Sequence, residues 1–368
     1  MSEPEAIVAG AGIWGCTVAR RLAESGRKVL VLEKRAAVGG NCRCETDPET
    51  GIETHLYGSH IFHTRNKEVW GFVNRFAKFN DYRHCVLARY KDKTYHLPIG
   101  CTLLKEFFGR DLKPSELTTA DRAAVFDAFV RGYTSKQWGV PPEQVPASVI
   151  ARLKIRDSFS TDYFDDPWQG IPVDGYNAMF KRMLDHPNIE VRCNCEFTIS
   201  KISSLIPRPS SLIPVYYSGP IDALFDYKFG PLPWRTLTFE LETLDCRDFQ
   251  GASVVNYTEA SVPCTRIHEF RHYHPESGGG LHPTIEQSNN LNSRTIIMRE
   301  YPRVWARGDD PYYPVETPDS AALLAKYRAE AAKHSNLVVG GRLGSFKYYD
   351  MDQAMSAALE TRLSSEMF

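Results

Sequence analysis

The pattern of apolar and polar positions near the start of the chain predicts a strand, a helix and a second strand. The stretch from Ala6 to Lys34, AIVAGAGIWGCTVARRLAESGRKVLVLEK, begins with a short apolar run that is typical of a buried strand. After a glycine turn, apolar positions at helical spacing predict a helix that begins near Trp14 and ends at Gly26. A second buried strand is predicted from Lys28 to Leu32, so the chain opens as a βαβ unit.

A second helical pattern lies near the middle of the chain. Residues 115–132 carry apolar positions at helical spacing, with Thr118 or Thr119 as the expected cap. Gly132 is the expected end of this helix, because glycine commonly ends helices. By contrast, residues 271–294 are rich in Gly, Ser and Asn and predict a mobile loop or an extended hairpin.

Strand patterns dominate the second half of the chain. β-Branched runs from Glu240 to Thr265 and from Thr295 to Glu300 predict strands of a second, antiparallel sheet. Residues 336–360 again show a strand, a glycine turn and a helix, so the chain is expected to return to its first domain. The predicted fold class is mixed α/β, with a discontinuous nucleotide-binding domain.

The first glycine turn carries a dinucleotide-binding pattern. The motif GxGxxG is formed by Gly10, Gly12 and Gly15. Glu33 ends the second strand about 20 residues later, where a carboxylate can accept a hydrogen bond from a ribose hydroxyl. The pair Gly39 and Gly40 follows and lets the backbone approach a cofactor closely. Together these features favour FAD over a nicotinamide cofactor.

Composition narrows the ligand class. The 44 basic and 45 acidic residues leave a formal charge of −1, so no global field attracts nucleic acid or a membrane surface. An anionic ligand must instead be met by locally placed arginines. No apolar run approaches the length of a membrane span, and the first residues do not resemble a signal peptide, which predicts a cytoplasmic protein without membrane insertion. Nine scattered cysteines suit reduced thiols.

Three histidines, His55, His60 and His63, lie within ten residues and raise the question of a metal site. Neutral imidazoles are common zinc ligands. However, the sequence contains no HExxH and no CxxC, so the pattern does not favour a metal.

Nine motifs in order resemble the bacterial UDP-galactopyranose mutases over nearly the whole chain: GAGIWG, EKRAAVGGN, YGSHIFHT, GYTSKQWG, YFDDPWQGIPVDGY, SGPIDALFDYKFG, VPCTRI, DDPYYPV and GGRLGSFKYYDMDQ. The resemblance implies an isomerase that interconverts UDP-galactopyranose and UDP-galactofuranose, or a closely related nucleotide sugar. It implies FAD that is active when reduced, because in this family N5 of the reduced flavin forms an adduct with the sugar and expels UDP. An external reductant such as NAD(P)H is implied as well.

The resemblance also implies site residues. Those carried over as catalytic are Arg152, Arg266 and His60. The residues expected to bind substrate are Phe129, Tyr133, Trp138, Tyr163, Tyr313, Tyr348, Asp350 and His84. The residues expected to bind the cofactor are Gly10, Gly12, Ile13, Trp14, Gly15, Glu33, Lys34, Gly40, Asn41, Gly58, Ser59, His60, Gly219, Gly341, Arg342, Tyr349, Asp350 and Met351. On spacing alone, packing explains the aromatic residues equally well.

The implied organisation has three parts. A Rossmann-like FAD-binding domain comprises residues 1–78, 167–230 and 314–368, a helical domain comprises residues 98–150, and an antiparallel-sheet substrate domain comprises residues 79–97, 151–166 and 231–313. The helical domain is shorter than in typical members and carries the family's dimer contacts, so a homodimer is an open expectation.

Several positions depart from the family pattern and leave alternatives open. Cys264 stands where an aromatic residue is expected, His84 and Cys85 stand where an asparagine and its neighbour are expected, and residues 275–293 look inserted. The preferred sugar is therefore open. A flavin amine-oxidase-like enzyme and a non-catalytic nucleotide-sugar-binding flavoprotein are the alternatives. Oxygen consumption or the absence of turnover distinguishes them.

Overall fold

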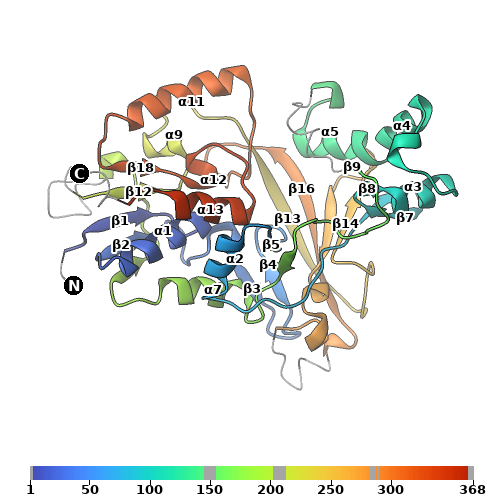
Figure 1. Ribbon diagram of the computed structural model, residues 1–368, viewed down its shortest axis with the longest axis horizontal. Helices are drawn as coiled ribbons and strands as arrows, with labels where there is room; N and C mark the ends of the chain where they lie inside the picture. Colours follow the sequence, from blue (N-terminus) through green and yellow to red (C-terminus); the bar gives the residue numbers. More distant parts are fainter. Residues whose placement is uncertain (1–2, 145–154, 202–212, 282–286, 288–289, 364–368) are drawn as a thin grey trace.

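The computed structural model describes residues 3–144, 155–201, 213–281, 287 and 290–363. Its first layer is a five-stranded parallel sheet (Figure 1). The strand order is β11 (Ile189–Arg192), β2 (Val29–Leu32), β1 (Ala6–Ala9), β12 (Val215–Tyr217) and β18 (Leu337–Val339). Strands from three distant parts of the chain meet here, so this sheet is discontinuous in sequence.

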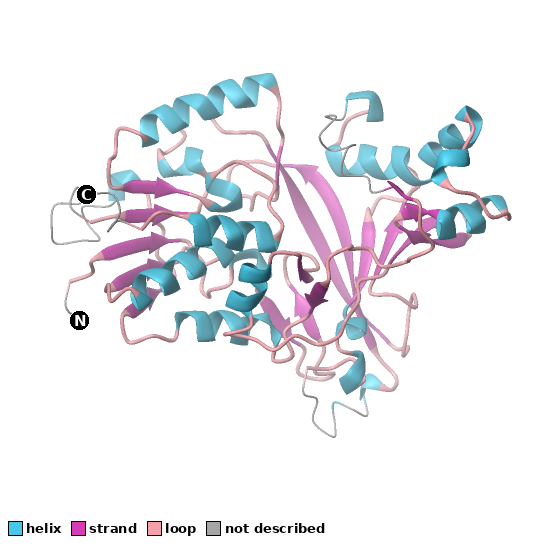
Figure 2. Cartoon of the chain, in the orientation of Figure 1, coloured by secondary structure: helices cyan, strands magenta, loops and turns pink. Residues whose placement is uncertain are grey.

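Helices cover both faces of the parallel sheet (Figure 2). One face packs on α1 (Ile13–Glu24), α7 (Gly175–Leu184) and α13 (Met351–Glu360), and the other on α9 (Ile221–Leu224) and α11 (Pro318–Ala331). Alternate residues of each strand enter opposite cores: Val8 faces the first group of helices and Ile7 faces the second. Because both faces are buried, the strands are almost entirely apolar, which explains the uninterrupted hydrophobic runs in the sequence.

The second layer is a seven-stranded sheet. Its strand order is β17 (Tyr313–Pro314), β13 (Trp234–Leu244), β16 (Thr295–Val304), β15 (Arg266–Glu269), β14 (Val254–Tyr257), β6 (Val86–Tyr90) and β7 (Lys93–Leu97). The expected antiparallel arrangement holds for all neighbours except one, because β14 and β6 run parallel with Val254 opposite Val86. This pair joins two segments that are far apart in the sequence, so no hairpin constrains their direction.

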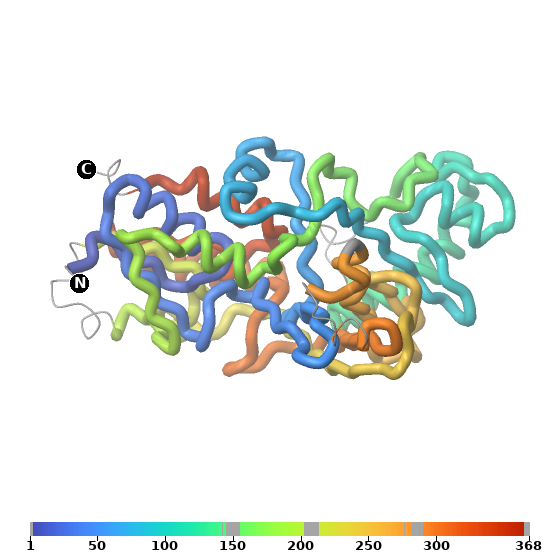
Figure 3. The backbone as a smooth tube through the Cα atoms, turned by 90° about the horizontal axis from the view of Figure 1, so that it is seen from below, coloured from blue at the N-terminus to red at the C-terminus, as the bar shows by residue number. Residues whose placement is uncertain are grey.

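Shorter elements complete the described chain. Two-stranded ladders are formed by β3 (Cys44–Thr46) with β4 (Glu53–His55), β5 (Phe62–Thr64) with β10 (Trp168–Gly170), and β8 (Ile99–Gly100) with β9 (Ile155–Arg156). The remaining helices are α2 (Lys67–Val73), α3 (Cys101–Phe108), α4 (Thr119–Phe126), α5 (Gly132–Trp138) and α12 (Gly341–Gly344). Helices α3, α4 and α5 lie at the opposite end of the molecule from the parallel sheet (Figures 1 and 3).

The predicted end of the central helix is wrong. The chain remains helical through a π-helical turn at Asp127–Arg131 and through Gly132, whose φ is −70°. The helix ends instead at Gly139, which has a left-handed φ of 68°. Gly132 serves another purpose, because a Cβ atom there would lie 2.2 Å from the carbonyl oxygen of Thr258. Its missing side chain lets α5 approach the large sheet.

Three further expectations concern the segment at residues 271–294, membrane-spanning helices and the fold class. Within residues 271–294, the described part forms 3-10 turns at Phe270–Tyr273 and Pro275–Ser277 rather than an extended hairpin. Among the described helices, none is long and apolar enough to cross a membrane. The predicted mixed α/β class with a Rossmann-like unit is confirmed by the sheet order and the helices on both faces. The residue boundaries of the three domains stay predictions.

Candidate functional site

A cavity of about 390 Å³ lies at the carboxyl edge of the parallel sheet. Most residues expected to bind a cofactor line it: Gly10, Gly12, Ile13, Trp14, Glu33, Lys34, Gly40, Asn41, His60, Gly219, Gly341, Arg342, Tyr349, Asp350 and Met351. Gly15, Gly58 and Ser59 are not among its lining residues. Arg35, Ser218 and Asp310 also line it; they lie within the quoted motifs but were not among the expected site residues. Arg35 directly follows Glu33 and Lys34, so its place in the sequence could have identified it as a further cavity residue.

The glycine turn leaves room for a phosphate at the start of α1. Gly10 has a left-handed φ of 100°, and a Cβ atom on Gly15 would lie 1.9 Å from the Gly10 carbonyl oxygen. Gly40 also approaches the turn closely, because a Cβ atom on it would lie 2.9 Å from the Cα atom of Gly12. Gly15 therefore serves the packing of the turn. The 12-residue helix α1 presents free N–H groups to this space, which suits a diphosphate.

Glu33 is held by the backbone around it. Its carboxylate accepts hydrogen bonds from the N–H groups of Ala11, at 2.8 Å, and Arg35, at 2.9 Å, and the residue is only 5% exposed. A carboxylate has about four acceptor sites, so capacity remains for a ribose hydroxyl. The backbone bonds fix the carboxylate at the cavity wall.

His60 and Arg342 also line the cavity. The Nδ1 atom of His60 donates to the Gly58 carbonyl oxygen at 2.6 Å, which leaves Nε2 as an acceptor. Burial, and secondly the charge of Arg342, lower the pKa of His60 to about 4, so its ring is neutral at pH 7. The Nε atom of Arg342 donates to the Tyr349 carbonyl oxygen at 2.9 Å. A fixed cation beside a neutral imidazole suits a cofactor ring that becomes negatively charged.

A row of flat side chains extends from Arg342, which lines the cavity. The guanidinium of Arg342 lies 4.9 Å from the ring centroid of Tyr348, and Tyr348 stacks on Tyr313 with centroids 5.5 Å apart and planes 11° apart. The ring of Trp138 follows, with its centroid 6.4 Å from that of Tyr313. Three segments that are distant in the sequence thus contribute to one row.

Arg266 lies near the same aromatic residues. It stands on β15 directly opposite Glu300 on β16, and its Nε atom is 3.4 Å from the Glu300 carboxylate. Its Nη2 atom also donates to the Tyr133 hydroxyl group. Burial raises the pKa of Tyr133 to about 12, so this hydroxyl is neutral. The side chain of Arg266 is 28% exposed and carries a positive charge that an anionic ligand can reach.

Helix α5, which carries Tyr133 and Trp138, is anchored to the large sheet by Lys136. The ammonium group of Lys136 donates to the carbonyl oxygens of Tyr257 at 2.7 Å, Val262 at 2.9 Å and Cys264 at 2.9 Å. Burial lowers the pKa of Lys136 to about 8. Cys264, which departs from the family pattern, contributes its backbone to this contact while its side chain is buried.

His84 and Tyr163 form a further part of the site. Their rings meet edge to face with centroids 5.6 Å apart, and the N–H group of Tyr163 donates to the His84 carbonyl oxygen at 2.7 Å. Burial, and then the charge of Arg266, lower the pKa of His84 to about 3. The sequence suggested both residues, but it gave no sign that they contact each other.

Two residues expected at the site stand apart. Phe129 is 6% exposed and packs against Tyr90, Tyr95 and Phe107, which favours a structural role over contact with a substrate. Arg152 lies outside the described residues.

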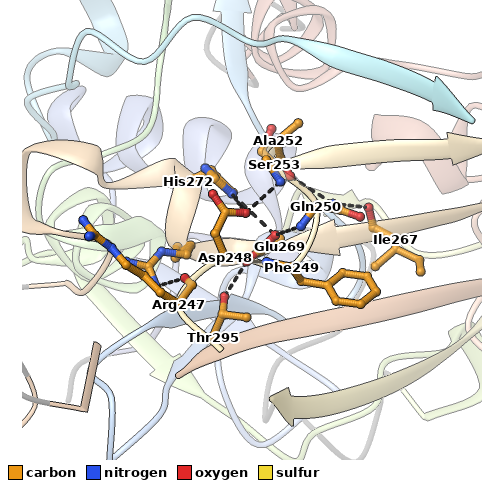
Figure 4. Close-up of polar contacts among 12 residues, drawn as sticks. Arg247, Asp248, Phe249, Gln250, Ala252, Ser253, Ile267, Glu269, His272 and Thr295 are labelled. Carbon is orange, nitrogen blue, oxygen red and sulfur yellow. Dashed lines mark hydrogen bonds and ion pairs between the residues drawn. The ribbon is translucent and has the colours of Figure 1, made fainter. Parts of the chain in front are cut away.

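Two groups of three potential metal ligands occur in the described parts of the chain: Cys44, Glu53 and His55, and Asp248, Glu269 and His272. Nδ1 of His55 accepts from the His60 N–H group, so its Nε2 carries the proton and offers no lone pair. The Glu269 carboxylate already accepts from the N–H groups of Phe249 and Gln250 and from Thr295 (Figure 4). Both groups therefore have structural explanations. His63 has one as well, because its Nδ1 atom lies 2.6 Å from the Asp166 carboxylate.

Comparisons with known proteins agree with this geometry. A family model described as UDP-galactopyranose mutase matches residues 128–348, and one described as an NAD(P)-binding Rossmann-like domain matches residues 8–76. A probable UDP-galactopyranose mutase of Klebsiella pneumoniae is 35% identical over 98% of this chain and 94% of the relative. A dTDP-fucopyranose mutase of Escherichia coli is 34% identical over 96% of both chains.

Solved structures agree on the fold. A crystal structure of reduced UDP-galactopyranose mutase superposes with a TM-score of 0.72 and 15% identity, covering 98% of this chain and 93% of the other. A putative protoporphyrinogen oxidase from Exiguobacterium reaches a TM-score of 0.58 at 12% identity, covering 97% of each chain. At these identities the superpositions support the fold alone.

Proposed function

The chain belongs to the UDP-galactopyranose mutase family, and from this premise we propose that it interconverts the pyranose and furanose forms of a nucleotide sugar with the help of FAD. The observation that carries this proposal is the row formed by Trp138, Tyr313, Tyr348 and Arg342. The row runs from the indole of Trp138, which is suited to stacking on a base, to Arg342 in the cavity that is suited to FAD. Arg266 lies close to the middle of the row.

The geometry supports a division of roles. The indole of Trp138 stacks on the nucleotide base, and the hydroxyl groups of Tyr313 and Tyr348 donate to the diphosphate. Arg266 supplies positive charge where the diphosphate leaves the sugar, an effect that is commonly worth about 3 kcal/mol in the transition state. Arg152 is proposed as the second arginine on the basis of the family pattern alone.

The cofactor side has its own roles. When bound and reduced, FAD would supply a nucleophile, and the isomerisation itself has no net redox change. Glu33 holds the ribose of the cofactor, and Arg342 stabilises negative charge on its reduced ring. His60, held neutral with Nε2 as an acceptor, lies beside that ring. Asp350 and Tyr163 are proposed to contact the substrate.

The second candidate function is that of a flavin amine-oxidase-like enzyme, but no residue described at the site favours it. An amine oxidase has no need of a base-stacking indole or of an arginine placed for a diphosphate. A non-catalytic binding protein would need the same residues, and only turnover separates it from an enzyme. An external reductant such as NAD(P)H and a homodimer are proposed from the family resemblance.

The proposal is tested with a panel of nucleotide sugars. Purified protein is reduced with dithionite under nitrogen and incubated with UDP-galactopyranose, dTDP-fucopyranose or UDP-glucose, and products are separated by chromatography. We expect furanose product from at least one of the first two sugars. Arg266→Ala serves as the matched control and should bind FAD but form little product. Failure of all three sugars to isomerise, with FAD bound and reduced, contradicts the proposal.

A further inference from the structure

The loop of Gly58, Ser59 and His60 borders the cofactor cavity, which His60 lines. Gly58 has a left-handed φ of 91°, and Nδ1 of His60 donates to its carbonyl oxygen at 2.6 Å, so the loop closes on itself. The backbone N–H group of His60 donates to Nδ1 of His55 at 3.0 Å. The backbone of a cavity residue is therefore held by a side chain that is not among the lining residues.

The bond to His60 fixes the protonation of His55. A backbone N–H group can only donate, so Nδ1 of His55 must be unprotonated. Burial, followed by the charges of neighbouring histidines, holds the pKa of His55 well below its usual range, so the ring is neutral at pH 7. The one ring proton of a neutral histidine then lies on Nε2. A single tautomer of His55 fits these contacts.

Three aromatic rings hold the imidazole of His55 in this orientation. Tyr273 stacks on it with centroids 5.1 Å apart and planes 17° apart. Tyr176 meets it edge to face at 5.6 Å, and Phe270 lies at the same distance with planes 44° apart. The side chain of His55 is fully buried. Rotation of the ring would displace these neighbours, so the Nδ1 lone pair stays directed at the His60 N–H group.

Packing alone would favour an apolar residue at position 55. The Nε2–H group of His55 is buried and has no hydrogen-bond partner among the described residues. The Glu53 carboxylate is 4.0 Å away, which is beyond hydrogen-bond distance. A buried donor without a partner is unfavourable. The contact with His60, and not core stability, therefore explains the imidazole.

A second histidine holds the side chain of the same loop. Oγ of Ser59 is 2.5 Å from Nδ1 of His268, and the Tyr273 hydroxyl donates to this oxygen at 2.5 Å. The ring of Tyr273 contacts His55 while its hydroxyl contacts Ser59. The side chain of Ser59 and the backbone of His60 are thus held at the same time.

We propose that His55 is a positioning residue for the cofactor: its neutral imidazole accepts the His60 N–H group and thereby fixes the His60 ring beside the flavin. With its backbone fixed and its Nδ1–H group bonded to Gly58, His60 has one position at the cavity wall. This role toward the flavin rests on the proposed function, whereas the bond between His55 and His60 does not.

Nitrogen NMR of the FAD-bound protein tests the tautomer of His55 without any change to the loop. Protonated and unprotonated ring nitrogens of a neutral histidine resonate far apart, and the His55 signals are identified by their loss in His55→Asn. At pH 7.5 we expect the proton on Nε2. An Nδ1–H form in the unaltered protein overturns the inference.

Two substitutions of His55 separate the acceptor from the volume of the side chain. Leucine fills the space but accepts no hydrogen bond, whereas the side-chain oxygen of asparagine takes a position similar to that of Nδ1. Hydrogen exchange of the His60 amide, identified by its loss in His60→Gln, should become about tenfold faster in His55→Leu and stay near the native rate in His55→Asn. The urea midpoint of His55→Leu should stay close to the native value, because removal of the unpartnered Nε2–H group offsets the lost hydrogen bond.

His274→Leu is the matched control for the loss of a buried imidazole. His274 is 3% exposed and lies 3.5 Å from the Glu53 carboxylate, and its described hydrogen bonds do not reach residues 58–60. The His60 amide should exchange at the native rate in this variant. Equal acceleration in His274→Leu and His55→Leu, or acceleration of all histidine amides together in His55→Leu, indicates general loosening and overturns the inference.

Two properties of the holoenzyme test the role toward the flavin. The visible absorption of bound FAD should change in His55→Leu and return to the native spectrum in His55→Asn. In the active enzyme, kcat should fall about tenfold in His55→Leu with little change in KM, because the loop borders the cofactor cavity. A faster-exchanging His60 amide with a native spectrum and native kcat overturns this role. If His55 behaves as expected but the unaltered protein isomerises no nucleotide sugar, the proposed function fails while the contact with His60 stands.

Discussion

Replacement of Lys136 by methionine should loosen helix α5, the helix that carries Tyr133 and Trp138. Lys136 donates three hydrogen bonds to backbone carbonyl oxygens of the large sheet, at 2.7 to 2.9 Å. Methionine keeps most of the length of the side chain and removes all three hydrogen bonds. The three carbonyl groups then lose their partner, and the helix loses its main polar anchor to the sheet.

The magnitude follows from two opposing effects. Hydrogen bonds to a charged group contribute about 1.5 kcal/mol each at the low end, or roughly 4 to 5 kcal/mol for three. Burial costs the ammonium group about 3 kcal/mol, because a pKa of about 8 lies about 2.4 units below the unfolded value and one unit is about 1.4 kcal/mol. The net loss of unfolding free energy in Lys136→Met at pH 7 is therefore about 1 to 2 kcal/mol.

The pH dependence provides a sharper test. The folded pKa of Lys136 is about 8, whereas the unfolded chain holds this proton up to about pH 10.4. Above pH 8 the unfolded state binds more protons, so stability rises with pH in the native protein. Lys136→Met lacks this gain. Its deficit should grow by about 1 kcal/mol between pH 7 and pH 9.

Urea unfolding of the FAD-bound protein at both pH values measures this deficit. Lys105→Met is the matched control, because Lys105 forms a solvent-exposed ion pair with Asp111 at 3.0 Å and should lose less than about 1 kcal/mol. A deficit that is absent at pH 7, or that shrinks toward pH 9, refutes the reasoning. Nucleotide binding should weaken in Lys136→Met and not in the control.

Three further predictions concern the site. Arg266→Ala should reduce kcat by about 100-fold or more while the FAD spectrum is retained, because stabilisation of the leaving diphosphate is lost; kcat close to that of the native enzyme would place the diphosphate elsewhere. Trp138→Ala should weaken binding of UDP by roughly 1 to 3 kcal/mol in calorimetry, and unchanged affinity would exclude base stacking. His84, with a folded pKa of about 3, takes up a proton on unfolding below about pH 6.5. Urea titrations should therefore show that lowering the pH from 7 to 5.5 costs the native protein about 1 kcal/mol more than His84→Gln, and equal losses would contradict the neutral buried ring.

The nucleotide-binding unit could be predicted from the sequence because its determinants are local. The strand, the glycine turn and the helix follow one another within about 30 residues, and the missing Cβ atoms of Gly10 and Gly15 have a direct steric cause. The resemblance added the aromatic site residues. No periodicity could have shown that Tyr313, Tyr348 and Trp138 form one row, because they belong to separate segments.

Other features could not be predicted because one residue type serves several purposes. Gly132 was expected to end a helix, yet its φ is helical and its missing side chain serves a close approach to Thr258. Phe129 has the right residue type and motif, but it packs into the helical core. The contact of Ser59 with His268 joins residues 209 positions apart and belongs to no motif.

The central claim is that this chain is a flavin-dependent isomerase with no net redox change, and counting turnovers per reduced flavin tests it most directly. The protein is reduced once under nitrogen, excess reductant is removed, and UDP-galactopyranose or the sugar identified in the panel is added. The account predicts many molecules of furanose product per flavin, no product from the air-oxidised protein and no stoichiometric oxygen consumption. One product per flavin, or equal activity in the oxidised state, contradicts it.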